Sequence, residues 1–434
     1  MALGVKRCAL RVERLTSRCR IFMIDKAVSF DNTENAFAYK SDAELKKARF
    51  LFKSMGNAFL VKWGTRITPW AIRLRLPIKG MIRKTIFSQF VGGETLEQTA
   101  RVASKLAAYN IKAILDYGVE GGNNGEAGFD EACGEFIRVI HYAASQPNIP
   151  FISIKVTGFA RFELLEKLDS SLDLSSGSLM KRYAAALAGF TETELAEWER
   201  VRNRMLKICE QASAKNIGVL VDAEETWIQD PVDVLSIQMM ALFNLGKVIV
   251  YNTVQLYRHD RLAFLTDMLE AAILKDFVLG VKLVRGAYME KERERAEEKG
   301  YVSPIQPDKE STDGDYDSAV NFCIDHIENI ASIVASHNDY SNLHATELLK
   351  EKGLSLEHPH IHFSQLYGMS DHITFNLAKA GCSVSKYLPF GPIEDVIPYL
   401  MRRAEENSSL SGQTGRELTL IKKEMERRKL KKVQ

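Results

Sequence analysis

The sequence predicts an α/β fold, a barrel of eight parallel strands, and two observations support this. Stretches with helical spacing separate short apolar runs, and strands that alternate with helices pair in parallel through right-handed crossovers. Eight such units is the number that closes a (β/α)8 TIM-type barrel. The eight runs, each ended by glycine or polar residues, are IKAILDYG, FISIKVTG, GVLVDAEE, VIVYNTVQ, GVKLVRGAY, IASIVASHN, IHFSQLYG and SVSKYLPFG.

A doubly wound open sheet is the structural rival of the barrel. No GxGxxG motif follows any of the runs, and the sequence has no GxxxxGKS or GxxxxGKT motif. Neither of the common phosphate-binding loops of open sheets therefore supports that fold. The 434 residues, 46% of them hydrophobic, are enough for one large barrel domain with added helices.

The chain divides into four parts, with a helical excursion at 157–217 between the second and third strands. The first 22 residues are rich in arginine and hold one acid, Glu13, which fits an organellar transit peptide and an upstream extension equally well. The basic tail is expected to be a solvated helix rather than a membrane-surface helix. The parts are an N-terminal extension expected to be disordered (1–34), N-terminal helices (35–110), the barrel (111–412) and a basic C-terminal helix (413–434).

Composition excludes several classes of protein. The formal net charge is +2, from 58 basic and 56 acidic residues, so no global field would concentrate nucleic acid, and no nucleic-acid partner is expected. Six cysteines without a CxxC pair suit a reducing compartment and argue against structural zinc. No run reaches the roughly twenty apolar residues that span a bilayer, so any membrane contact would be peripheral.

Polar residues at the ends of the predicted strands are the first candidates for a site, because a barrel of this kind places its reactive groups there. Taken singly, a lysine or aspartate at such a position is more often part of a structural ion pair. Six in register are harder to explain in that way. They are Lys155, Asp222, Gln255, His337, Asn338 and Tyr387.

The run GVKLVRGAY carries a second candidate. Alternation along a strand puts Lys282, Val284 and Gly286 on one face and Leu283 and Arg285 on the other. A glycine there lets the backbone approach a flat partner, such as a planar cofactor. A tight turn that needs glycine for its dihedral angles explains the residue equally well.

The segment FGPIEDVIPYLMRRAEEN predicts a helix that begins at Pro398. Tyr399, Arg402 and Arg403 share one face, with Glu406 one turn further along, and two guanidinium groups beside an aromatic ring suit a carboxylate on an apolar ring. The alternative is an ordinary wet face, with an Arg402–Glu406 pair worth about 0.3 kcal/mol. In that case the buried stripe of the helix is Val396, Leu400 and Ala404.

The segment HPHIH at 358–362 places three histidines on one face of an extended chain. No cysteine or second carboxylate cluster is near in sequence, and catalytic zinc sites usually show helical histidine spacing or such partners. No metal site is therefore assigned.

Six motifs together resemble proline dehydrogenase, in the same order and spacing, from about Gln89 to Ser409. The single-activity branch of the family is more similar than the long bifunctional proteins. These motifs are GVLVDAEETW, VKLVRGAYMEKERERA, VASHN, FSQLYGM, YLPFGP and IPYLMRRAEENSS.

The resemblance implies a distorted (β/α)8 barrel with its last helix over the strand ends and FAD bound without a covalent link. It implies oxidation of L-proline to Δ1-pyrroline-5-carboxylate, with electrons passed to a membrane quinone. It also implies roles for matched residues. Arg402, Arg403 and Lys155 would hold the substrate carboxylate, Asp222 would orient these cations, and Tyr288, Leu366, Tyr387 and Tyr399 would enclose the ring. Gln255, Lys282, Val284, Gly286, His337, Asn338 and Glu406 would contact the flavin.

Two matched positions bear on the details. Lys282 stands where some relatives have arginine, which leaves its exact contact open. Hydroxyproline-oxidising relatives have a smaller residue at the position of Tyr387, so the tyrosine favours proline over its hydroxylated form.

The sequence is compatible with other functions as well. Strand-end lysines such as Lys155 and Lys282 also suit Schiff-base aldolases on the same barrel, and a non-catalytic regulatory barrel or a hydroxyproline dehydrogenase is also possible. A pyrroline-5-carboxylate dehydrogenase is a candidate partner for the labile product. The expected location is the bacterial cytoplasm at the inner face of the membrane, with a mitochondrion as the alternative.

Overall fold

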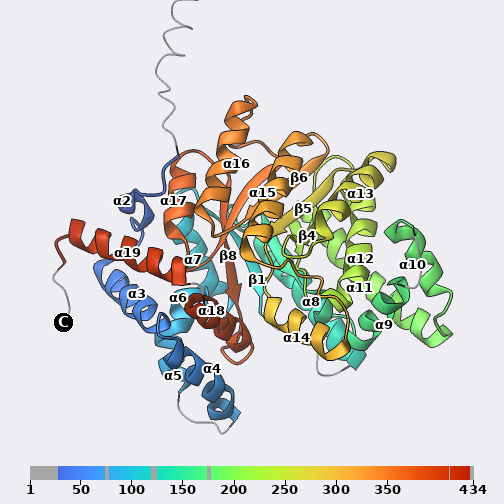
Figure 1. The fold of residues 1–434 in the computed structure, drawn as a ribbon, viewed down its shortest axis with the longest axis horizontal. Helices are drawn as coiled ribbons and strands as arrows, with labels where there is room; N and C mark the ends of the chain where they lie inside the picture. Colours follow the sequence, from blue (N-terminus) through green and yellow to red (C-terminus); the bar gives the residue numbers. More distant parts are fainter. Residues whose placement is uncertain (1–27, 74–77, 119–124, 174–176, 410, 431–434) are drawn as a thin grey trace, which may run out of the picture.

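The computed structural model describes residues 28–73, 78–118, 125–173, 177–409 and 411–430 (Figure 1). Most of the expected N-terminal extension, residues 1–27, lies outside these ranges, as does the end of the basic tail, residues 431–434.

The centre of the molecule is a closed barrel of eight parallel strands in sequence order, in which β1 pairs with β8. Seven strands fall within the predicted apolar runs and β5 begins one residue before its run, so the predicted barrel is confirmed and the open sheet is excluded. The strands are β1 Lys112–Tyr117, β2 Phe151–Ile154, β3 Gly218–Val221, β4 Val250–Gln255, β5 Leu279–Val284, β6 Ile330–Ala335, β7 Ile361–Leu366 and β8 Val384–Phe390.

A ring of helices covers the outside of the barrel. The excursion at 157–217 contains α9 Phe162–Asp173, α10 Leu179–Leu187 and α11 Glu192–Lys215, and α11 begins with a capping box between Thr191 and Glu194. The other helices of the ring are α7 Leu96–Ala107, α8 Gly125–Ala144, α12 Gln229–Phe243, α13 Arg261–Leu274, α14 Met289–Lys299, α15 Lys309–Asp325, α16 Asp339–Glu351 and α17 Asp371–Lys379.

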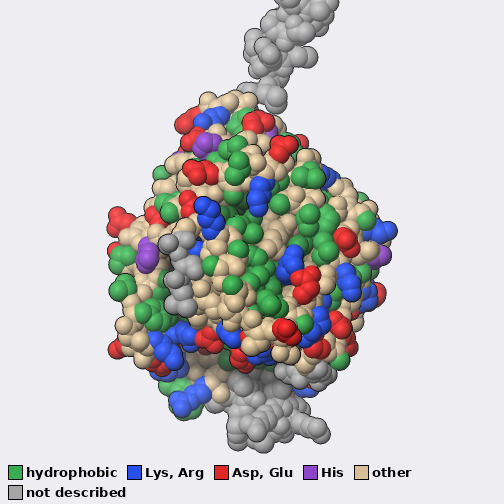
Figure 2. Space-filling model, turned by 90° about the vertical axis from the view of Figure 1, so that its right-hand side faces the viewer, with side chains coloured by type: hydrophobic (Ala, Val, Ile, Leu, Met, Phe, Trp, Pro, Cys, Tyr) green, Lys and Arg blue, Asp and Glu red, His purple; other side chains and the backbone are tan. Residues whose placement is uncertain are grey.

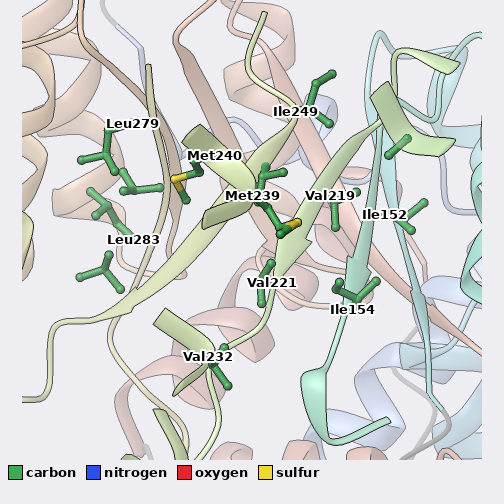
Figure 3. Close-up of a cluster of buried hydrophobic side chains, with 14 of the residues drawn as sticks. Ile152, Ile154, Val219, Val221, Val232, Met239, Met240, Ile249, Leu279 and Leu283 are labelled. Atoms are coloured by element: carbon green, nitrogen blue, oxygen red, sulfur yellow. The ribbon is translucent and has the colours of Figure 1, made fainter. Parts of the chain in front are cut away.

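The main core lies between the strands and this ring. Figure 3 shows part of it, where Val232, Met239 and Met240 of α12 gather with Val219 and Val221 of β3 in one cluster. A smaller cluster fills the inside of the barrel, with Ile114, Leu220 and Ile333 among its members. Side chains therefore fill the barrel, as they do in other folds of this kind.

A second core holds the two ends of the described chain together. It joins the N-terminal helices to the last two helices, and its members include Phe52, Tyr399, Leu400 and Ile421. Figure 1 shows α19 beside α3. The N-terminal elements are α2 Thr33–Ala36, α3 Asp42–Met55, α4 Ala58–Arg73, α5 Lys79–Ile82, a π-helical turn Arg83–Phe87 and α6 Ser88–Phe90; the last two helices are α18 Ile397–Ser409 and α19 Ser411–Arg427.

The basic tail differs from the expected solvated helix. Arg428 donates hydrogen bonds to the backbone oxygens of Phe37 and Lys40, and Glu424 is fully buried between Arg427 and Arg428. The tail packs on α3 because its apolar residues, Leu420, Ile421 and Met425, complete the second core.

The histidines of HPHIH lie at the amino end of the barrel, beside a cavity of about 250 Å³. His362 is buried with Nε2 2.6 Å from Ser385 Oγ, and His360 Nδ1 is 2.6 Å from the Ile327 oxygen. Within the described ranges, no three His, Cys, Asp or Glu residues are arranged to hold a metal ion. Burial lowers the pKa of His362 to about 3, and the charge of Lys112 acts in the same direction.

This depressed pKa makes acid destabilising. An unfolded histidine binds its proton near pH 6.5, so His362 stabilises the fold above that pH and the contribution is lost as pH falls toward 3. Between pH 6.5 and pH 5.0 the stability of the His362→Asn variant should fall about 1.5 kcal/mol less than that of the unmodified protein. Denaturant unfolding at both pH values measures this difference. Equal losses in the two proteins would contradict the assignment.

Candidate active site

The carboxyl ends of the strands bring a set of charged side chains together at the barrel mouth. Asp222, just after β3, lies at the centre of this set. Its Oδ2 accepts a hydrogen bond of 2.6 Å from the hydroxyl of Tyr387 on β8, and its Oδ1 pairs with the ammonium of Lys282 on β5. Three strands that are distant in sequence are thereby linked through one carboxylate.

Asp116 on β1 is a second carboxylate at the mouth, one that was not predicted from the sequence. It is buried, and burial raises its pKa; the charge of Lys155 opposes this shift, and that of Asp222 adds to it. For Asp222, burial also acts to raise the pKa, but Lys282, Lys155 and the hydrogen bond from Tyr387 lower it overall. Asp222 is therefore the carboxylate that stays ionised among these cations. Alternation from Ile114, which faces the barrel interior, was the signal for Asp116.

Helix α18 places its aromatic and basic side chains against the mouth. Tyr399 is 9% exposed and Arg403 is 7% exposed, so the wet-face alternative is wrong for both. Val396, Leu400 and Ala404 on the other side are buried as well, in the second core. The helix is buried on both sides because it lies between the barrel and the N-terminal helices.

The cations of α18 are organised around tyrosines. The Arg403 guanidinium carbon lies 5.1 Å from the centre of the Tyr399 ring, and Arg403 pairs with Glu406. Arg402 acts electrostatically on Tyr288 together with Lys155. Burial raises the pKa of Tyr288 and of Tyr399, so both hydroxyls stay neutral.

Several buried polar atoms near the mouth lack a hydrogen-bond partner within the described protein. They are the Tyr399 hydroxyl, Arg403 Nε and Gln255 Oε1. Gln255, at the end of β4, donates from Nε2 to the Glu224 oxygen at 2.9 Å, which fixes its side chain. Unmet buried groups cost free energy, so their presence together indicates a place where a polar ligand supplies the missing partners.

The strand β5 follows the predicted alternation. Lys282 faces the mouth, Leu283 is buried in the outer core, and Arg285 bonds to Asp313 and to Ser336 outside the barrel. Val284 pairs with Gln255 in register.

Gly286 has φ +133°, and a Cβ there would lie 2.5 Å from ring atoms of Tyr257. Both the dihedral explanation and the close approach therefore apply, and the flat partner within the protein is the tyrosine ring.

Three more candidates lie at the carboxyl ends of neighbouring strands: His337 and Asn338 just after β6, and Leu366 at the end of β7. His337 Nδ1 is 2.9 Å from Ser370 Oγ, and burial lowers its pKa to about 3, with the charges of Lys386 and Arg403 acting in the same direction. Asn338 uses its side-chain oxygen to cap α16, accepting from the Tyr340 amide at 2.8 Å, so that oxygen is already committed. Leu366 ends β7 and packs against the second core beneath α18.

Two further residues had no signal in the sequence. Glu417 of α19 accepts the amide hydrogen of Ser370, a residue with φ +49° whose hydroxyl meets His337. Lys386 on β8 is fully buried and pairs with Asp371 Oδ1 at 3.0 Å. Both contacts join parts of the chain that only the folded barrel brings together.

The fold and the mouth define a class of protein: a (β/α)8 barrel enzyme with a helix over a cation-rich site. A family model described as proline dehydrogenase matches residues 99–416. The chain belongs to the proline dehydrogenase family, a family of oxidoreductases.

Individual relatives agree with this family. The chain is 33% identical to the mitochondrial proline dehydrogenase 1 of Dictyostelium discoideum, covering 92% of this chain and 74% of that protein. It is 31% identical to the hydroxyproline dehydrogenase of Xenopus laevis, covering 93% and 90%.

A solved structure of proline utilization A from Bdellovibrio bacteriovorus, inactivated by N-propargylglycine, has the same fold, with a TM-score of 0.65 and 17% identity. That match covers 94% of this chain, which spans 42% of the length of the longer protein.

Gly286 provides a test of the geometry at the mouth. Gly286→Ala should destabilise the protein by about 3 kcal/mol or more, because the new methyl group meets the Tyr257 ring at a backbone conformation that alanine disfavours. The matched control is Gly300→Ala, where φ is +73° and nothing lies within 4 Å of the new Cβ, so the cost should be about 1 kcal/mol. Thermal unfolding of the two variants measures both values. Equal costs would show that the ring does not limit the site.

Proposed function

We propose that the protein oxidises L-proline to Δ1-pyrroline-5-carboxylate with non-covalently bound FAD and passes the electrons to a membrane quinone, the first step of proline catabolism. The observation that carries this proposal is the inward face of α18, where Arg403 and Tyr399 are buried over the mouth and Arg402 acts with Lys155 on Tyr288. Such an arrangement suits a small anion attached to an apolar ring.

Binding of the substrate carboxylate falls to Arg402, Arg403 and Lys155. Two guanidinium groups held by a helix can each contribute about 1.5 to 3 kcal/mol as charge-assisted hydrogen bonds in a partly dry site. Arg403 Nε has no partner within the described protein and is available for such a bond. Asp222 holds Lys282 and Tyr387 in place, which keeps the pocket beside these cations in one arrangement.

The ring of the substrate would be enclosed by Tyr288, Leu366, Tyr387 and Tyr399. Aromatic and aliphatic walls exclude water and orient the carbon next to the ring nitrogen. The neutral state of the tyrosine hydroxyls, which burial favours, leaves the cations of the mouth to the carboxylate.

The residues present fit a flavin. Gln255 offers a fixed, unpaired buried acceptor, Lys282 a cation, and His337 a neutral ring; Val284, Gly286, Asn338 and Glu406 complete the proposed contacts. The oxygen of Asn338 caps α16, so its amide group would make the contact. When bound, FAD supplies a hydride acceptor at its N5 atom.

A second substrate is favoured by one observation, the relative named hydroxyproline dehydrogenase at 31% identity. Against it stands Tyr387, whose hydroxyl is bonded to Asp222; in the proposed site this side chain would occupy the room that a ring hydroxyl needs. We therefore favour L-proline.

The proposal also includes a partner enzyme and a cellular location. A pyrroline-5-carboxylate dehydrogenase is proposed as the acceptor of the product, and proline utilization A proteins are among the solved structures with this fold. Among the helices of the described residues, none combines the length and the hydrophobic sequence that a membrane span requires. We propose a peripheral position at the bacterial inner membrane, with a mitochondrial location as the alternative.

Flavin colour tests the reaction directly. The purified protein should show a flavin spectrum that bleaches under anaerobic conditions on addition of L-proline, and much more slowly with trans-4-hydroxy-L-proline. Faster bleaching by the hydroxylated substrate would favour the second candidate. A protein without flavin that borohydride traps on a carbonyl substrate would point to a Schiff-base aldolase at Lys155 or Lys282, and no reaction with either would leave a non-catalytic barrel.

The carboxylate clamp is tested by Arg402→Met and Arg403→Met. Each should raise KM for L-proline at least tenfold, because a charge-assisted hydrogen bond of about 1.5 to 3 kcal/mol is lost, while the flavin stays bound. Steady-state kinetics with a soluble dye acceptor measure KM. Arg427→Met on α19, which pairs with Glu424 away from the mouth, is the control and should leave KM unchanged. An unchanged KM in both site variants would remove the assignment.

A further inference from the structure

One segment of the chain has a charge balance unlike the rest. Residues 45–93 contain eleven lysines and arginines and no aspartate or glutamate, in a chain whose total formal charge is only +2. The described part of this basic segment comprises most of α3, helices α4, α5 and α6, and the turn between α5 and α6. The whole-chain composition hid this imbalance, because acidic residues elsewhere cancel it.

Large apolar side chains on the same segment are exposed. Five of them, from α3, α4 and α5, are between 51% and 68% exposed: Phe50, Phe59, Leu60, Trp63 and Met81. We call these five residues the apolar face. Phe59 and Trp63 lie one helical turn apart, with ring centres separated by 6.1 Å. Exposed aromatic and aliphatic groups in this number on a short stretch indicate an interaction surface.

The orientation of α4 is set by packing on its other side. Val61 is buried in the second core, in the cluster that contains Tyr399 and Leu400 of α18. Because Val61 points inward, its neighbours Phe59, Leu60 and Trp63 point away from the protein. The apolar face is thus held outward by the same contacts that hold α18 over the mouth.

Unpaired cations accompany the apolar face. Lys46, Lys53, Lys62, Arg66 and Lys84 are exposed, and none has an ion pair with a residue in the described ranges, whereas Lys79 pairs with Glu394 and Arg83 with Glu94. Surfaces that lie in the interface of an anionic bilayer typically combine Trp, Phe and Leu with Lys and Arg. Nucleic acid would use the cations but leave the aliphatic groups in water.

We propose that residues 45–66 and 78–84 dock this protein on an anionic phospholipid membrane, with the apolar face entering the lipid interface and the unpaired cations meeting lipid headgroups. The docking surface lies beside the helix that covers the mouth, so docking would serve electron transfer to a membrane quinone. This step rests on the proposed function. Helix α4 packs on α18, and the Lys79–Glu394 pair ties α5 to the segment before α18 (Figure 1). A quinone dissolved in the membrane would therefore reach the mouth beside the docking surface.

Vesicle flotation of the full chain tests the surface. The unmodified protein should float with vesicles of 70% phosphatidylcholine and 30% phosphatidylglycerol, and far less with phosphatidylcholine alone. The triple variant Phe59→Ser, Leu60→Ser, Trp63→Ser and the double variant Lys62→Glu, Arg66→Glu should each bind the anionic vesicles at least tenfold more weakly.

The matched control comes from the opposite side of the molecule. Leu242, Leu245 and Leu274, on or just after α12 and α13, are also more than half exposed. Figure 2 shows that side, where lysines and arginines mix with aspartates and glutamates among apolar groups. The triple variant Leu242→Ser, Leu245→Ser, Leu274→Ser should bind vesicles within twofold of the unmodified protein.

Kinetics separate this proposal from the proposed function. Both docking variants should keep the rate of proline oxidation with a soluble dye acceptor and lose at least fivefold with a quinone embedded in anionic vesicles. If the protein does not oxidise proline, vesicle flotation still measures membrane binding by this surface, because the flotation assay needs neither substrate nor flavin.

Three results would overturn the proposal. One is vesicle binding that both docking variants retain. Another is a change from dimer to monomer in light scattering with vesicle binding unaltered, which would make the face a contact between two copies. The third is that the docking variants lose binding to duplex DNA but keep binding to vesicles, which would make the face a nucleic-acid surface.

Discussion

The burial of α18 on both of its sides is the constraint on which the candidate site depends. One side packs in the second core with the N-terminal helices through Leu400 and Ala404, and the other holds Tyr399 and Arg403, which are buried as well. A helix with only one buried side could turn its arginines into solvent, where they would be fully hydrated and gain little from binding an anion. Here the packing on both sides keeps Arg403 buried.

This burial has an electrostatic cost that the mouth offsets by pairing. Asp222 pairs with Lys282 and accepts from Tyr387, and Arg403 pairs with Glu406. Buried ion pairs recover part of the desolvation penalty only when their remaining hydrogen bonds are met. Arg403 Nε and the Tyr399 hydroxyl have no hydrogen-bond partner within the described protein. Their desolvation is therefore uncompensated at the point where a carboxylate and a ring would bind. Substrate binding would then relieve a cost that folding has already incurred.

Local sequence patterns predicted the barrel. The features that could not be predicted depend on contacts between residues far apart in the sequence. All eight strands were visible because buried parallel strands read as short apolar runs. Alternation placed Lys282 and Arg285 on opposite faces of β5 correctly, and the same rule applied to β1 would have found Asp116. It could not show that α19 packs on α3, or that Glu417 reaches Ser370, because those partners are joined only by the folded chain.

The N-terminal helices connect these points, because one set of contacts serves two surfaces. The second core needs apolar residues from α3, α4, α18 and α19 together, and removing any one of these helices would expose the others. Val61 shows how the two surfaces are coupled: its burial against α18 fixes the angle of α4, and that angle exposes Phe59 and Trp63. A force that drew α4 toward a bilayer would act on α18 through the same contact. The position of α18 over the mouth and the proposed attachment to a membrane would therefore be coupled mechanically through α4.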